Sequence, residues 1–351
     1  MINKQSIYYW FFFPLLALLS AGSLTSCIYD SVLEETDTSG KSTLSITMRG
    51  ITTTDPSTSG GSYDDYVKTL RVIGYDNTGD VVCNQLFDYV DNNGIPNFKV
   101  TESDEVNITQ TLEDAFQGGV CDFYFIANEF IANEDGYSVY NSQTTLSEYL
   151  NTDPKKDALD QCMIATPTDL AILGSSPILM TTSVRSTLKP GDNTINNIEL
   201  VRCFAKVQLK IIDKTGSATV GENPVLTGTC PEFYSLLDVG TYTSWTGEEG
   251  NYSVNLTMTQ EGSTYTSQEI YFPERLFAQG ENIEVNALKF SFTLNDKPYT
   301  EAVADATGTD FNIRRNTHYT VIATLKKKET VTFNVMVNAW GEKKMDVPAF
   351  E

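Results

Sequence analysis

The feature that most constrains the fold of this chain is the short period of its apolar side chains. Apolar and polar residues alternate over many short runs, and clusters of Gly, Pro, Asn, Asp and Ser separate these runs. A period of two gives a strand one apolar and one polar face. The sequence contains neither the spacing of a long amphipathic helix nor a fixed-period repeat. It therefore predicts an all-β fold of two antiparallel β-sandwich domains, with short helices in the connections.

The first predicted strand, at residues 42–49, alternates most clearly. Its apolar residues Leu44, Ile46 and Met48 occupy every second position, with Ser and Thr between them. Because side chains two residues apart share one face of a strand, we expect a half-buried strand here.

A long polar segment follows at residues 50–66. It is rich in Thr, Ser, Asp and Gly and has few apolar residues. Such a composition is typical of an exposed loop. We interpret the neighbouring Asp64 and Asp65 as solvated loop charges.

Turns separate the remaining predicted elements. Strands are predicted at residues 67–75, 81–86, 107–112, 121–127, 177–180 and 194–200, and short helices at 145–150 and 155–161. After a turn-rich break at 189–192, strands are predicted at 199–212, 252–258, 269–272, 288–294, 318–325 and 331–340. We therefore expect an N-terminal sandwich at 42–195 and a C-terminal sandwich at 196–351.

Residues 1–27 are typical of a bacterial lipoprotein leader. Lys4 precedes an apolar run, and Leu24-Thr25-Ser26 stands directly before Cys27. A basic start, an apolar core and small residues before a cut mark a secretory signal. We expect the thiol of Cys27 to be acylated and to tether the protein to a membrane by its lipid, with 28–41 as an acidic tether. An uncleaved membrane anchor is the alternative.

Composition argues against several classes of partner and of chemistry. The net charge is −22, so we expect no binding of nucleic acid through charge. His318 is the one histidine, which removes most histidine catalysis and any zinc site of two imidazoles. No pair of carboxylates stands out as an acid and base. We predict no catalytic residue, no metal ligand and no cofactor.

The cysteines beyond the leader have irregular spacing and form no Cys-x-x-Cys pair. Several lie in apolar, strand-like runs, so we interpret them as buried free thiols, while a single disulfide stays open. They are Cys83, Cys121, Cys162, Cys203 and Cys230.

Several short motifs, taken in their order along the chain, resemble those of a known family. They are Val67-Lys68-Thr69-Leu70-Arg71-Val72 before Tyr75-Asp76-Asn77-Thr78-Gly79, Tyr124-Phe125-Ile126-Ala127-Asn128, Arg202-Cys203-Phe204-Ala205-Lys206-Val207, Tyr271-Phe272-Pro273-Glu274, Ile313-Arg314-Arg315-Asn316-Thr317-His318-Tyr319 and Trp340. Behind a lipobox, this series resembles the fimbrillins of Bacteroidales, the subunits of type V pili and their lipid-linked anchors.

The resemblance implies two transthyretin-like β-sandwich domains and export as a lipoprotein. It also implies that an arginine-specific protease cuts after the first strand, and that a strand from the next subunit fills the groove left behind. The implied partners are other fimbrial subunits, the protease and the outer membrane.

Arg49 and Gly50 fit the processing step. Arg49 ends the first predicted strand directly before the polar loop, where a protease finds an accessible segment. Arg71 is a poorer site, because it lies inside a predicted strand. The alternative is that Arg49 only ends a strand with a charge.

Two C-terminal segments fit the donor strand. In the first, alternating residues share one face: Val331, Phe333, Val335, Val337 and Ala339. This segment is equally well interpreted as the last strand of its own sandwich. Residues 346–351 are the second candidate.

We therefore expect a shaft or tip subunit of a cell-surface fimbrium that supports adhesion. A lipid-linked anchor that keeps its first strand is the alternative within the family. A glycan-binding surface lipoprotein is the alternative from another class, and nothing in the sequence indicates an enzyme.

Overall fold

The structure is a computed structural model that describes residues 42–49, 63–88, 99–100, 106–112, 117–130, 136–221, 223–237, 249–277, 280–326 and 330–340. Cys27 with the expected leader, the acidic tether, Gly50 and residues 346–351 lie outside these ranges. Within them, no helix is both long and apolar enough to cross a membrane.

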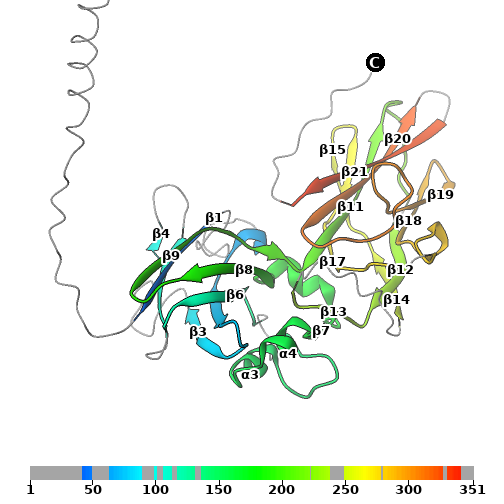
Figure 1. The fold of residues 1–351 in the computed structure, drawn as a ribbon. Coiled ribbons are helices and arrows are strands. Elements are labelled where there is room, and N and C mark those ends of the chain that lie inside the picture. Colours follow the sequence, from blue (N-terminus) through cyan, green and yellow to red (C-terminus); the bar gives the residue numbers. More distant parts are fainter. Residues whose placement is uncertain are drawn as a thin grey trace, which may run out of the picture. The chain divides into compact units, whose positions relative to one another are not determined.

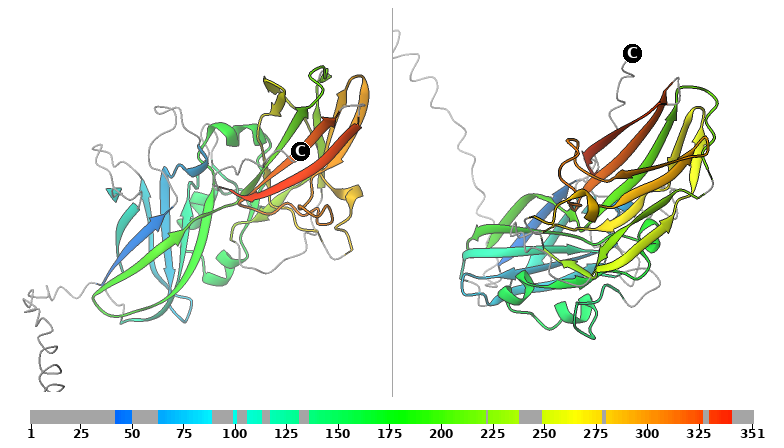
Figure 2. Two further views of the ribbon diagram at one scale, coloured as in Figure 1. Left: turned by 90° about the horizontal axis from the view of Figure 1, so that it is seen from above. Right: turned by 90° about the vertical axis from the view of Figure 1, so that its right-hand side faces the viewer.

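The predicted all-β fold is confirmed, and the first half of the chain forms two sheets (Figures 1 and 2). Sheet 1 has the strand order β4-β5-β1-β9, and sheet 2 has the order β10-β8-β6-β2-β3. Their strands are β1 (Thr43–Arg49), β2 (Thr69–Tyr75), β3 (Val81–Asp88), β4 (Lys99–Val100), β5 (Val106–Thr111), β6 (Gly119–Ala127), β8 (Met180–Leu188), β9 (Asp192–Glu199) and β10 (Val201–Arg202).

The second half forms two further sheets. Sheet 3 has the order β15-β16-β11-β20-β21, with β17 also paired to β11, and sheet 4 has the order β14-β12-β18-β19. Their strands are β11 (Phe204–Asp213), β12 (Val225–Pro231), β14 (Glu249–Asn255), β15 (Met258–Glu261), β16 (Thr264–Ser267), β17 (Ile270–Pro273), β18 (Lys289–Leu294), β19 (Lys297–Ala302), β20 (Thr317–Lys326) and β21 (Thr330–Ala339).

Short elements fill the connections, as the sequence predicts. A two-stranded ribbon pairs β7 (Met163–Ala165) with β13 (Phe233–Ser235) and so joins the two halves of the chain. The helices within the described ranges are η1 (Tyr63–Asp65), α3 (Leu146–Leu150), α4 (Lys156–Asp160), η2 (Leu170–Ser175) and η3 (Glu284–Asn286). Thr145 and Glu148 form a capping box that starts α3.

Among the described strands, two pairs are parallel, which the expectation of antiparallel sandwiches did not include. β1 runs parallel to β9, and β11 runs parallel to β20. Parallel neighbours need a long connection, and in both cases the chain returns only after passing through other strands. Each half therefore contains a mixed sheet.

The change from the first pair of sheets to the second lies after the boundary expected at 195/196. That boundary falls inside β9, which belongs to sheet 1. The break at 189–192 is a turn that takes the chain from β8 in sheet 2 to β9 in sheet 1. In it Gly191 has a φ of 92° and the Lys189 amide donates to Asn193 Oδ1. We therefore place the division at Cys203, between β10 and β11.

Within sheet 2, β2 is buried on both faces, and all seven of its residues are buried. Leu70 and Val72 point into a core shared with β1, whereas Ile73 and Tyr75 point into a second core. The second core receives apolar residues from α3 and α4, including Leu150 and Leu159, and Figure 1 shows both helices beside this sheet. Sequence alternation predicted a single apolar face, because it did not reveal this covering segment.

The described cysteines are free thiols. Four are buried and Cys230 is partly exposed. Burial raises the pKa of Cys162 to about 12 and that of Cys121 to about 11, so both stay protonated and unreactive at neutral pH.

Three turns repeat one local sequence, Asp-x-Thr-Gly, beginning at Asp76, Asp213 and Asp305. In each, the aspartate accepts a hydrogen bond from the threonine hydroxyl two residues later and from following backbone amides. Desolvation raises the pKa of Asp305, but the bonds from Thr307 and from the Thr309 and Asp310 amides outweigh it and lower the pKa to about 2.

We predict that the turn at Asp305 makes the free energy of unfolding depend on pH in the acidic range. The pKa of Asp305 is lowered on folding, so its contribution is present above the unfolded pKa of about 3.9 and disappears as pH falls toward 2. In urea unfolding between pH 5 and pH 3, Thr307→Val should lose less free energy of unfolding than the wild type. Thr307→Ser keeps the hydroxyl and should behave like the wild type; equal slopes in all three proteins would contradict the prediction.

Candidate functional site

β1 lies in the middle of sheet 1 and is paired along both edges. Residues Thr43 to Met48 face β5 in antiparallel register. On the other side β1 pairs in parallel with β9 from Thr43 to Arg49, with a bulge between Ile46 and Met48. Removing β1 would leave two unpaired strand edges facing one slot, and such edges readily pair with another strand.

The apolar face of β1 is part of the first core. The side chains of Leu44, Ile46 and Met48 are each 0% exposed. They share a cluster with residues of sheet 2 and of both neighbouring strands, among them Val72, Phe125, Ile108 and Ile195. Burial of three such side chains contributes about 5–9 kcal/mol, which is comparable with the whole stability of a domain, about 5–15 kcal/mol. The first sandwich therefore needs β1 or a substitute strand.

Hydrogen bonds fix the start of β1 to the β8–β9 turn. The Thr43 amide donates to the Gly191 carbonyl at 3.2 Å, and the Gly191 amide donates to Ser42 Oγ at 3.0 Å. Thr43 Oγ1 donates to Asp192 Oδ1 at 2.5 Å. These contacts hold the register of β1 at its first residues, whereas its last residue leads directly into 50–62.

Arg49 is the last residue of β1, and its partner on β9 is Glu199. The expected cleavage point therefore lies at a strand end. Arg71, the other arginine considered, lies inside β2 and is 2% exposed. Its guanidinium donates two hydrogen bonds of 2.8 Å to the buried carboxylate of Glu129. A protease needs an extended, accessible segment, and Arg71 offers none.

The expectation that Asp64 and Asp65 are solvated loop charges is wrong for Asp64, whereas the Asp65 side chain is 47% exposed and ion-paired. Both belong to η1, which follows directly on residues 50–62, and Asp64 is buried. The Asp64 carboxylate accepts hydrogen bonds from Lys206 Nζ and, at 2.8 Å, from the Tyr271 hydroxyl. Asp65 pairs with Arg202. The local composition could not show this, because the basic partners come from β10 and β11, far along the chain.

Trp340, directly after β21, covers the same basic side chains. Its ring centroid lies 5.2 Å from the Arg202 guanidinium and 4.9 Å from Lys206 Nζ, and its carbonyl accepts a hydrogen bond from Arg202 at 3.3 Å. Lys206 also binds Glu269 at 2.5 Å. Burial lowers the pKa of Arg202 and raises that of Tyr271, which the Asp64 charge raises further. We call Asp64, Asp65, Arg202, Lys206, Glu269, Tyr271 and Trp340 the η1 clamp.

The chain is thus held differently on the two sides of residues 50–62. β1 is held by sheet 1, whereas η1 is held by side chains of β10 and β11. A cut between Arg49 and Gly50 would separate β1 from everything that follows and leave the clamp intact.

The predicted donor residues form β21, which pairs with β20 along its whole length. Val335 is buried, and Phe333 packs against Phe292 and Tyr299 with ring centroids 6.2 Å apart. The other predicted donor residues differ in burial: Val331 and Val337 are half-buried, and Ala339 is exposed. The segment therefore closes the second core of its own chain, one of the two interpretations that the sequence left open.

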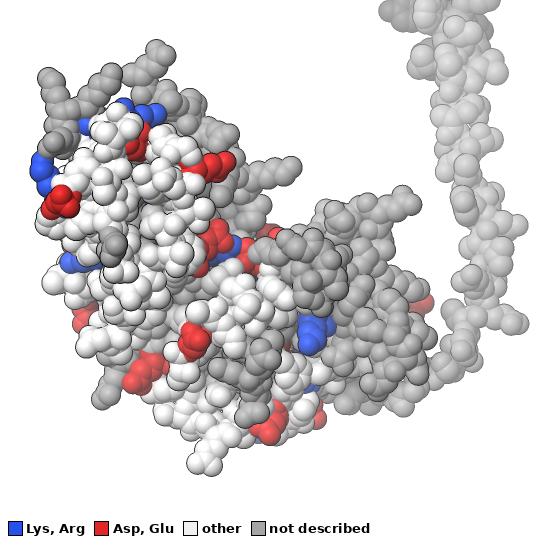
Figure 3. Space-filling view, turned by 180° about the vertical axis from the view of Figure 1, so that it is seen from behind, with Lys and Arg blue, Asp and Glu red and all other residues white. Residues whose placement is uncertain are grey.

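The remaining charged motifs form internal pairs. Arg315 binds Glu274 at 2.8 Å, and Arg314 binds Asp310 at 3.0 Å. On the face shown in Figure 3, basic side chains lie singly among acidic ones rather than in a patch. Among the residues that the structure describes, no group of three or more His, Cys, Asp or Glu side chains is placed to hold a metal ion.

Comparison with known proteins gives one family match. The family described as major fimbrial subunit protein (FimA) matches residues 42–225, just over half of the 351 residues. The match begins at the residue before β1. No curated protein matches the chain.

Solved structures share the fold over most of the chain. The tip fimbrial protein Mfa3 from Porphyromonas gingivalis, truncated at its C-terminus, is 15% identical with a TM-score of 0.58, over 86% of this chain and 100% of that chain. A candidate cell adhesion protein from Parabacteroides distasonis is 14% identical with a TM-score of 0.54, over 86% and 97%. Another from Bacteroides eggerthii is 14% identical with a TM-score of 0.51, over 86% and 96%.

We predict that the η1 clamp stabilises the protein through Lys206. Lys206→Met should lower the free energy of unfolding by about 3–5 kcal/mol, because it leaves the buried Asp64 carboxylate without its cation. Urea unfolding followed by tryptophan fluorescence measures the change. The double variant Asp64→Asn/Lys206→Met should recover part of the loss.

Lys210→Met is the matched control, since Lys210 lies on the same strand and makes no ion pair with the described residues. It should change stability by less than about 0.5 kcal/mol. A Lys206→Met loss no larger than this would show that the clamp does not stabilise the fold.

Proposed function

Because the chain belongs to the major fimbrial subunit protein (FimA) family, we propose that it is a shaft or tip subunit that joins its neighbours by strand exchange. The resemblance to the fimbrillins is confirmed, and the family is one of structural fimbrial subunits rather than enzymes. The coarse function is therefore that of a subunit of a cell-surface fimbrium with a role in adhesion.

The observation that carries the proposal is the position of β1. A strand at the edge of a sheet leaves one free edge when it is lost, whereas β1 separates two partners and supplies three fully buried side chains. Its loss opens a slot lined by strand edges and apolar side chains, which a strand of similar alternation can fill. The intact chain keeps this slot closed, so assembly waits for processing.

Processing at Arg49–Gly50 fits the local geometry. The cut falls at the end of β1, beyond the last residue paired with β5. The η1 clamp holds the chain that follows, so the processed subunit keeps its remaining strands in place while β1 leaves. An arginine-specific protease acts here, outside the cell, after the lipid on Cys27 has brought the precursor to the outer membrane.

The donor strand is assigned to the C-terminal tail that follows Trp340, residues 341–351, rather than to β21. β21 packs in the core of its own sandwich. If it left, its side chains Val335 and Phe333 would be withdrawn from that core. The tail includes Met345, Val347 and Ala349 at alternate positions. These can occupy the places of Leu44, Ile46 and Met48 in the slot of the next subunit.

We predict that an arginine-specific protease triggers assembly of the purified protein. The substrate is the chain from residue 27 with Cys27→Ser, which cannot be lipidated. Treatment should yield a new N-terminus at Gly50 and a ladder of oligomers that resists mild denaturant. Arg49→Ala should abolish both, whereas Arg185→Ala should leave both unchanged, since Arg185 is an exposed arginine in β8.

Two results would contradict parts of the proposal. Oligomers that form equally well from Arg49→Ala would show that cleavage is not the trigger. On cells, a surface protein that keeps lipidated Cys27 and an uncut Arg49 would identify the anchor subunit instead of a shaft or tip subunit.

A further inference from the structure

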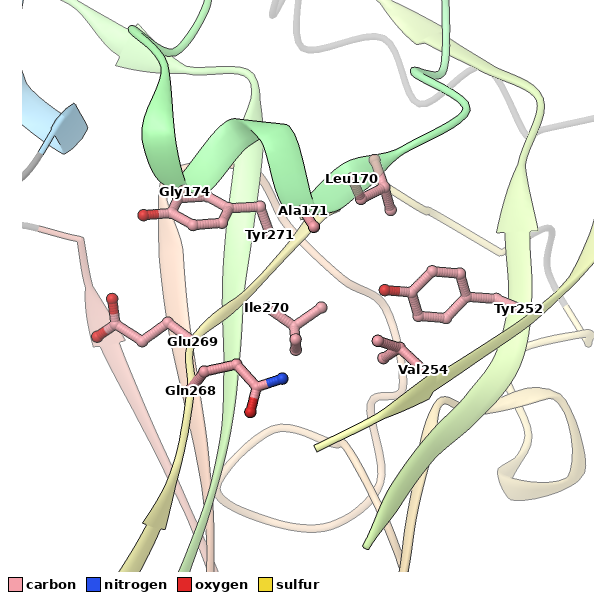
Figure 4. Close-up of a pocket in the computed structure, with 9 residues that line it drawn as sticks. All are labelled: Leu170, Ala171, Gly174, Tyr252, Val254, Gln268, Glu269, Ile270 and Tyr271. Carbon is pink, nitrogen blue, oxygen red and sulfur yellow. The ribbon is translucent and has the colours of Figure 1, made fainter. Parts of the chain in front are cut away.

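A pocket opens between the two sheets of the second sandwich. It has a volume of about 460 Å³ and lies between β14 and β17, beneath η2 (Figure 4). Its walls are mostly apolar, with Leu170 and Ala171 from η2, Val254 from β14 and Ile270 from β17. A pocket of this size has room for a few side chains.

Both strands beside the pocket have an unpaired edge. β14 is the outermost strand of sheet 4, and β17 pairs only with β11 among the described strands. The gap closes beyond the pocket, where the Gln268 amide donates to the Thr257 carbonyl at 3.1 Å. An extended peptide in the pocket would therefore meet free backbone groups as well as apolar walls.

Most polar side chains that line the pocket already have hydrogen-bond or ion-pair partners. Gln268 accepts a hydrogen bond from the Thr257 amide at 2.5 Å and donates to the Asn255 carbonyl, and Glu269 binds Lys206. Figure 4 shows the Tyr271 hydroxyl and the Glu269 carboxylate directed away from Tyr252, whose hydroxyl points into the space. A saccharide, which needs several polar partners, would find few here, whereas a largely apolar peptide needs only one or two.

The C-terminal tail starts beside this pocket. Tyr271 lines the pocket, and its ring centroid lies 5.7 Å from that of Trp340, the last described residue. Residues 341–351 follow, and an extended chain of this length reaches roughly 35 Å. Crossing one strand takes about 5 Å, so the tail can bring Met345, Val347 and Phe350 to the opening.

We propose that in the unassembled protein the C-terminal tail docks in the pocket between β14 and β17 of its own chain. The tail adds its backbone to a free strand edge and places apolar side chains against Leu170, Val254 and Ile270. Tyr252 donates its hydroxyl to a tail carbonyl. The inference concerns where the tail binds before assembly and does not depend on strand exchange. If the tail is also the donor strand, docking prevents it from binding to neighbouring subunits.

Digestion by a broad-specificity carboxypeptidase, followed by intact mass, tests the docking on the uncleaved chain from residue 27 with Cys27→Ser. Ala171→Trp fills the opening from an exposed position of η2, and should speed removal of residues 345–351 at least tenfold. Ser175→Trp is the matched control, since Ser175 is exposed on the same helix but does not line the pocket. It should leave the digestion rate of the wild type unchanged.

A second measurement covers the case in which the tryptophan disturbs the fold. The pair Ala171→Cys and Phe350→Cys should form a disulfide within one chain on mild oxidation, faster than the pair Ser175→Cys and Phe350→Cys. Equal digestion of the wild type and Ala171→Trp, together with equal cross-linking of the two pairs, would overturn the proposal. So would protection or cross-linking that falls on dilution, which would assign the pocket to the tail of a second copy.

Discussion

The structure depends on the burial of one short strand between two others. The side chains of Leu44, Ile46 and Met48 pack in the first core. The backbone of β1 pairs by hydrogen bonds with the facing edges of both β5 and β9. β5 and β9 pair with β1 and not with each other, so sheet 1 is continuous only while β1 or an equivalent strand is present. Because β1 is also the first described element of the chain and is followed by residues outside any described strand, the segment that completes the sandwich is the one most easily separated from it.

Charge keeps the rest of the chain in place around this strand. The η1 clamp joins the residues that follow 50–62 to β10, β11 and the end of β21, and nearly every member is paired or covered by an aromatic ring. Removing one partner of such a buried pair costs far more than losing an exposed pair, because the remaining charge stays away from water. Residues 42–62 lie directly before η1, and the C-terminal tail lies directly after Trp340. Both segments are proposed to change during assembly. One anchor therefore fixes the bases of both.

Much of the strand pattern could be predicted, and the failures have identifiable causes. β1, β6, β18 and β20 alternate or run apolar and lie close to their predicted positions. β8 and β19 escaped prediction, because β8 is largely Thr, Ser and Val with one exposed face and β19 is mostly exposed polar side chains. Their strand form comes from pairing with β6 and β18 rather than from local preference. Asp64 was misjudged for the same kind of reason, since its partners Lys206 and Tyr271 are distant in sequence.

The sequence by itself determined the class of the fold, the apolar face of β1, the place of Arg49 at its end and the alternation of residues 331–339. Each of these follows from side chains within a few positions of one another, where the two-residue period of a strand decides which face a side chain occupies. Only the tertiary structure decided that β1 is a central strand, that β21 closes its own core and that Asp64 of η1 is buried. These depend on which distant segments become neighbours, and a local period specifies the face of a strand but not its partner.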